Sequence, residues 1–117
     1  MTNTITNESS TLLARKRIGA VAFGMLNDEI GFLEGTIELV SLHHKAALEE
    51  SDPDFTPFVA IASETDNLPI GKSRQHWSNQ ALVKHQPEID AAIIWAKQFG
   101  TLACQSLVRR FHAKLKK

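Results

Sequence analysis

The strongest constraint on the fold is a run of apolar and small residues that recur every three or four positions near the C-terminus. Its members are Ile89, Ala92, Ile93, Ala96, Gly100, Ala103, Leu107 and Phe111. This spacing places them on one face of an α-helix, so it predicts a long helix that packs against other helices. Pro87 stands just before the run, where proline suits a helix start, and Ser78 is a suitable cap for a short helix from Asn79 to about His85.

A second helical pattern occupies the first third of the chain. It consists of Ile18, Ala22, Leu26, Ile30, Leu33, Ile37 and Val40. The pattern continues through Asn27, Asp28 and Glu29, which by themselves resemble a helix start. One long helix and two helices with a kink near Asn27 both fit, and we favour the kink because Gly24 and Gly31 flank it.

The middle of the chain contains a turn and a short apolar segment. Ser51 to Asp54 is predicted to form the turn, and Thr56-Pro57 suits a helix cap followed by a first helical residue. Phe58 to Ala62 is compatible with a strand as well as with a helix. We favour a helix, since a single strand would have no partner in the rest of the sequence.

These patterns together predict an all-α bundle of four to five helices with a long C-terminal helix. The 117 residues, 43% of them apolar, can bury a core without disulfides. We expect one helical domain over residues 10–117, which begins at a cap on Ser9 or Ser10. Residues 1–9 are polar and aperiodic, and we expect them to be disordered.

The charge balance argues against nucleic acid as a partner. Thirteen basic and thirteen acidic residues cancel, whereas a nucleic-acid-binding domain has a basic excess. The middle is nevertheless acidic and the C-terminus basic, which we interpret as favourable helix electrostatics at Arg109 and Arg110. The apolar run from Ile18 to Leu26 is too short to span a membrane. A single cysteine, Cys104, suits a reducing compartment, so we expect a cytoplasmic protein.

Several short motifs do not meet the requirements of the chemistry that they suggest. Gly71-Lys72-Ser73 resembles the end of a phosphate-binding loop, but Asp66 occupies the position of the required first glycine. The adjacent His43 and His44 point about 100° apart on a helix, so they do not form a metal site. Glu34 and Glu38 share a helix face, which we interpret as a solvated face. We therefore expect no metal, no cofactor and no catalytic residue, with Cys104 buried.

The segment from Ser63 to Ser78 is the candidate ligand-binding site. It brings five functional side chains into one loop, and these are Glu64, Asp66, Arg74, His76 and Trp77. Loops of mixed chemistry on a rigid scaffold often carry function, and an arginine fork suits a carboxylate or phosphate. The structural alternative is an ion pair of Arg74 with Glu64 or Asp66, with Trp77 buried beneath the loop.

The same region resembles a family of small uncharacterised bacterial cytosolic proteins. The resemblance rests on Leu33-Glu34-Gly35, Asp52-Pro53-Asp54-Phe55, Val59-Ala60-Ile61, Ser63-Glu64-Thr65-Asp66, Leu68-Pro69-Ile70-Gly71, Arg74 and Trp77-Ser78. It implies a bacterial cytosolic domain and carries over no activity.

We expect a binding or regulatory module that recognises a protein partner or a small polar ligand. The alternatives are a small enzyme that uses Glu64, Asp66 and His76, and a toxin-neutralising immunity protein. A homodimer is also expected, because Trp95 and Phe99 and the glycines offer more close-packing surface than a small monomer needs. The glycines concerned are Gly19, Gly24, Gly31 and Gly35.

Overall fold

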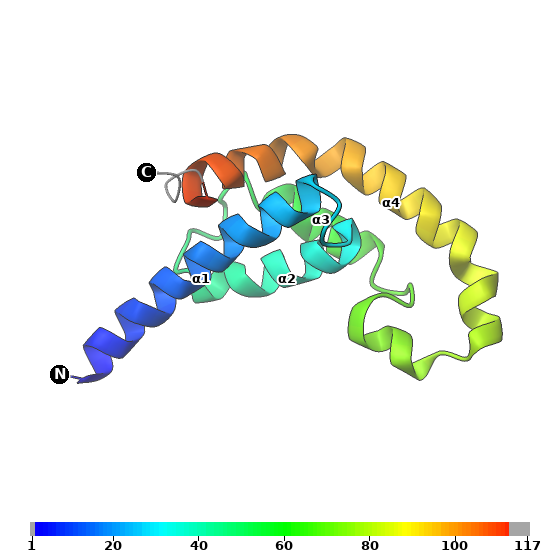
Figure 1. Ribbon diagram of the computed structural model, residues 1–117, viewed down its shortest axis with the longest axis horizontal. Helices are drawn as coiled ribbons and strands as arrows, with labels where there is room; N and C mark the ends of the chain where they lie inside the picture. The colour runs from blue at the N-terminus through cyan, green and yellow to red at the C-terminus, as the bar shows by residue number, and fades with distance from the viewer. Residues whose placement is uncertain (1, 113–117) are drawn as a thin grey trace.

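The computed structural model describes residues 2–112, with side chains from Ser9 to Gly71 and from Arg74 to His112 (Figure 1). Its elements are α1 (Thr2–Leu26), α2 (Phe32–Lys45), α3 (Thr56–Glu64), the 3-10 helix η1 (Gly71–His76), α4 (Asn79–Leu107) and the π-helical turn η2 (Val108–His112). The described residues contain no strand. The all-α prediction is therefore confirmed, and Phe58 to Ala62 forms a helix.

The prediction of two helices interrupted near Asn27 is confirmed, but the chain reverses there into an antiparallel hairpin and does not form a kink (Figure 1). The Asn27 side-chain amide donates to the Phe23 carbonyl oxygen at 2.7 Å, and Asp28 adopts a left-handed backbone with φ 60°. These features end α1 and reverse the chain. The predicted apolar pattern is only partly buried. Ile18, Ala22 and Leu33 lie in the core, but Ile37 is exposed and Leu39, outside the pattern, is fully buried.

Two glycines of the α1–α2 hairpin let neighbouring helices of the same chain approach each other closely. A Cβ on Gly35 would lie 2.4 Å from Met25 Cγ and Sδ, so α1 and α2 can approach only because Gly35 has no side chain. A Cβ on Gly19 would lie 2.7 Å from the backbone of Phe111 and His112, which places η2 directly against α1. These two glycines are therefore used inside the bundle.

The predicted buried face of the C-terminal helix is confirmed. Ile89, Ala96, Gly100, Ala103 and Leu107 are buried, and Ala92, Ile93 and Phe111 pack against the core cluster. The predicted division of this segment at Pro87 is wrong, because α4 is continuous from Asn79.

Helix α4 begins eight residues before Pro87 and continues through it. The Ser78 side-chain oxygen accepts the Ala81 backbone N–H at 3.1 Å, so the predicted cap is confirmed. Pro87 has no N–H for the carbonyl of Val83, and proline in this position bends a helix. Figure 1 shows α4 curving in its first half, away from the α1–α2 hairpin.

Two other helix starts differ from their predictions. Thr56 is already helical, and Phe55 is the residue that precedes α3. Helix α1 begins at Thr2 and not after Ser9 or Ser10, and its first turns project past the end of α2 (Figure 1). An existing helix extends at low cost, since each further residue adds one hydrogen bond. Disorder of residues 1–9 in solution stays a prediction.

Candidate functional site

A groove lies between α2 and the segment that follows α3. It has a volume of about 830 Å³. Its lining consists of Glu34, Ile37, Glu38, Ser41, Ala62, Thr65, Asp66, Leu68, Ile70 and Gly71. A volume in this range is typical of pockets that take a small molecule or a few side chains of a partner.

Two elements and a tight turn form this groove. Helix α2 supplies Ile37, whose apolar side chain is 46% exposed on the solvent-facing side of the helix, next to Glu34 and Ser41. The opposite wall is held by Thr65, whose hydroxyl donates to the Ile61 carbonyl oxygen at 2.8 Å. Gly71 has φ 62°, a conformation that favours glycine, and this lets the chain turn close to Ile37.

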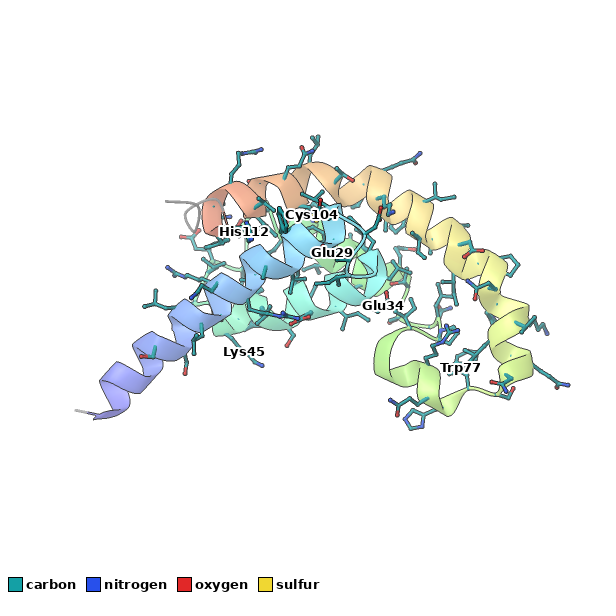
Figure 2. The ribbon with its side chains drawn as sticks, in the orientation of Figure 1. Glu29, Glu34, Lys45, Trp77, Cys104 and His112 are labelled. Carbon is teal, nitrogen blue, oxygen red and sulfur yellow. The ribbon has the colours of Figure 1, made fainter. Side chains whose placement is uncertain are left out.

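The electrostatics of the groove are one-sided. Among the side chains that the structure describes, the charged residues of the lining are the three carboxylates Glu34, Glu38 and Asp66. Glu38 is paired with Arg17 of α1, at 2.5 Å and 3.0 Å between their side-chain atoms. Glu34 and Asp66 are exposed, so the rim has a net negative charge above an apolar floor. Figure 2 shows Glu34 at the end of α2 that faces η1.

The five residues predicted to bind a ligand do not all line the groove. Asp66 lines the groove, whereas Glu64, Arg74, His76 and Trp77 are not part of its lining. Trp77 lies between η1 and the first turns of α4 (Figure 2) and meets the ring of His85 edge-on, with centroids 5.1 Å apart. A site shared by all five residues stays a prediction.

The structural alternative for this loop predicted an ion pair of Arg74. Arg74, Glu64 and Asp66 are all exposed, and the described structure contains no ion pair between the arginine and either acid. Trp77 is only partly buried. The segment predicted as one loop contains the end of α3 and the 3-10 helix η1, and proximity in sequence did not produce the expected contact.

A polar cluster joins the turn before α3 to the end of α4 and to η2. Arg110 donates to Asp52 through two hydrogen bonds of 3.1 Å and to Asp54 Oδ2 at 2.7 Å. The Ser106 hydroxyl donates to the same Asp54 oxygen at 2.7 Å. The Asp54 backbone N–H donates to Asp52 Oδ1 at 3.0 Å, which is the local turn expected of aspartate at this position.

The charges of this cluster stabilise one another. Burial alone would raise the pKa of Asp52, but the hydrogen bonds from Arg110 and from the Asp54 amide outweigh it and lower the pKa of Asp52. The hydrogen bond to Asp52 raises the pKa of Arg110, against the effect of burial. Both acids accept hydrogen bonds from the guanidinium of Arg110, so the cluster is a structural clamp between the turn that precedes α3 and η2.

Sequence reasoning missed this clamp, although its signal was present. The acidic middle and the basic C-terminus were recognised, but the basic end was interpreted through helix electrostatics alone. The pairing spans 58 residues from Asp52 to Arg110, and no local spacing rule predicts a contact at that separation.

Two further predicted features can be placed. Cys104 is fully buried, as predicted, and burial raises the pKa of its thiol to about 12. Among the side chains described, those of residues 9–71 and 74–112, no group of three or more His, Cys, Asp and Glu residues is arranged to hold a metal ion. Within residues 2–112, no helix has both the length and the apolar composition required to cross a bilayer.

Comparisons of this chain with known protein families, with curated proteins and with solved structures find no significant match. The family resemblance of the sequence stays a hypothesis.

Proposed function

We propose that this protein is a non-catalytic binding module whose groove beside α2 receives an apolar side chain from a basic segment of a partner protein. The observation that carries the proposal is the composition of the groove, an apolar floor of Ile37, Leu68 and Ile70 under a rim of carboxylates. Such a surface complements a segment that presents large aliphatic side chains next to lysine or arginine.

A small anionic ligand fits this groove less well. The rim carboxylates repel a carboxylate or a phosphate, and Arg74, the expected donor fork, lies outside the lining. An enzyme that uses Glu64, Asp66 and His76 is disfavoured for a related reason, because Asp66 is the single member of that set in the groove.

A toxin-neutralising immunity protein is a special case of the same binding mode. An acidic rim would suit the basic surface of a nucleic-acid-cleaving toxin, because such a surface must itself attract phosphates. A bacterial, cytoplasmic setting is part of the proposal, and the free thiol of Cys104 suits such a reducing compartment.

Two matched synthetic peptides test the proposal. One is a labelled amphipathic helix of leucine and lysine, and in the other every lysine is replaced by glutamate. Fluorescence anisotropy should show binding of the lysine peptide, weakened by salt, and none of the glutamate peptide. Equal binding of both peptides would overturn the proposed charge complementarity.

Variants locate the binding surface. Ile37→Ser removes an apolar contact worth about 1 kcal/mol, since about half of its surface remains to be buried, and this corresponds to a loss of about fivefold in affinity. Asp66→Asn should reduce both affinity and its salt dependence. Val59→Ser is the matched control, because Val59 of α3 is 48% exposed but outside the groove lining. An equal loss with Val59→Ser would place the peptide elsewhere.

A further inference from the structure

An uncovered apolar strip lies on the outer face of α4. Trp95, Phe99 and Leu102 are 38%, 49% and 78% exposed, and their spacing of four and three residues places them on one face of the helix. The rings of Trp95 and Phe99 stack with centroids 5.4 Å apart. The adjacent face of the same turns, about 100° around the helix axis, carries Ala96, Gly100 and Ala103 and is buried in the bundle. A contiguous patch of large exposed side chains is typical of an interaction site.

The strip is also free of charge. Lys97 is the one ionisable side chain with a charge at neutral pH between Asp90 and Arg109. Its ammonium group pairs with Asp28 of the α1–α2 turn at 2.9 Å, so it is directed away from the strip. The strip therefore has nothing to repel an identical surface.

Charges appear where the strip ends, and they have opposite signs. Glu88, Trp95 and Leu102 follow one another at intervals of seven residues, which is two turns of α4, and Arg109 stands seven residues further along in the π-helical turn η2. The strip thus has an acidic residue at one end and a basic residue at the other. Both end residues are exposed, and Glu88 contacts only the nearby His85 among the ion pairs of the described residues.

We propose that the strip binds a second copy of this chain, with the two α4 helices antiparallel about a two-fold axis between Gln98 and Phe99. Trp95 and Leu102 are equidistant from this point, so each tryptophan meets the leucine of the second copy. Glu88 and Arg109 are also equidistant, so each acid meets a base. A parallel pairing would instead place Glu88 against Glu88 and Arg109 against Arg109, which repel.

This inference goes beyond the proposed function, because the strip on α4 and the groove beside α2 share no lining residue. Either surface can fail its test without affecting the other. A dimer would present two grooves, which raises the affinity for a partner that carries two matching segments.

Light scattering at micromolar concentration should give twice the 13.0 kDa mass of one chain. Leu102→Glu should give the mass of one chain. Each strip would then carry two carboxylates, at positions 88 and 102, and the new carboxylate would be buried against the tryptophan of the second copy. Val83→Glu is the matched control, since Val83 of α4 is 74% exposed but does not belong to the seven-residue series. A monomeric wild-type chain, or a dimer that survives Leu102→Glu, would overturn the proposal.

Charge reversal tests the antiparallel register. Glu88→Arg and Arg109→Glu should each weaken self-association. In each variant the two ends of the strip carry charges of the same sign, so the ends that meet in the dimer repel each other. An equimolar mixture of the two variants should form a heterodimer, because every basic end then meets an acidic end. A mixture that associates no better than the separate variants would refute this register. Circular dichroism of each variant verifies that the helices are retained.

Discussion

Replacement of Arg110 by alanine should destabilise the fold through loss of the clamp at Asp52 and Asp54. Arg110 provides three hydrogen bonds to these two carboxylates, and Asp52 is only 9% exposed. The variant leaves Asp52 charged and largely buried with one remaining backbone donor, the Asp54 amide. An unpaired buried charge costs more than the deleted bond itself contributed.

The magnitude follows from the exposure of the pair. Removing one partner of a fully buried ion pair costs about 3–5 kcal/mol, and an exposed pair contributes less than about 1 kcal/mol. Arg110 is 36% exposed, and Ser106 continues to donate to Asp54 after the substitution. We therefore expect a loss of about 2 kcal/mol, which is a fall of about 8 °C in Tm for a domain of this length.

Urea unfolding at several pH values checks both the size and the cause. Because the folded-state pKa of Asp52 is lowered below 3.8, its contribution is complete above that value and is lost as the pH falls through the folded pKa. The difference between wild type and Arg110→Ala should therefore be full at neutral pH and should shrink in acid. Arg74→Ala is the matched control and should leave stability unchanged, since Arg74 is exposed and has no ion pair among the described residues.

A double-mutant cycle decides whether the charges act as a unit. Asp52→Asn preserves the shape of the side chain, so Asp52→Asn and Arg110→Ala together should cost less than the sum of the single losses. Strict additivity, a pH-independent loss, or an equal loss with Arg74→Ala would refute the clamp as the source of the stability.

Two other predictions concern the interior. Cys104 should resist a thiol reagent in the native protein, even in mildly alkaline buffer, because burial raises its pKa to about 12, and it should react at once in urea; rapid native labelling would place it at the surface. Gly19→Ala should cost at least about 1 kcal/mol in urea unfolding, because the new Cβ meets the backbone of η2 and the strain exceeds the gain in helix propensity. Gly31→Ala, whose Cβ would meet only the flexible end of Glu34, is the control, and an equal loss there would contradict this explanation.

The sequence by itself determined the helices, since the physical signals for them act over three or four residues. Such short-range signals predicted the buried face from Ile89 to Leu107, the cap at Ser78 and the interruption of the helix near Asn27. Each depends on contacts between neighbouring turns or on the conformation of single residues, and both can be assessed from a short window of sequence.

The tertiary structure alone decided which distant residues meet. Glu34 and Ile37 reach Asp66 and Leu68 across the groove only because α2 and α3 pack side by side. Arg110 reaches Asp52 only because η2 packs against α1 at Gly19. Pro87 remains inside α4 although its local preference is for a helix start. Such outcomes depend on the summed packing of whole helices, which exceeds the preference of any one residue and is not encoded at any fixed spacing.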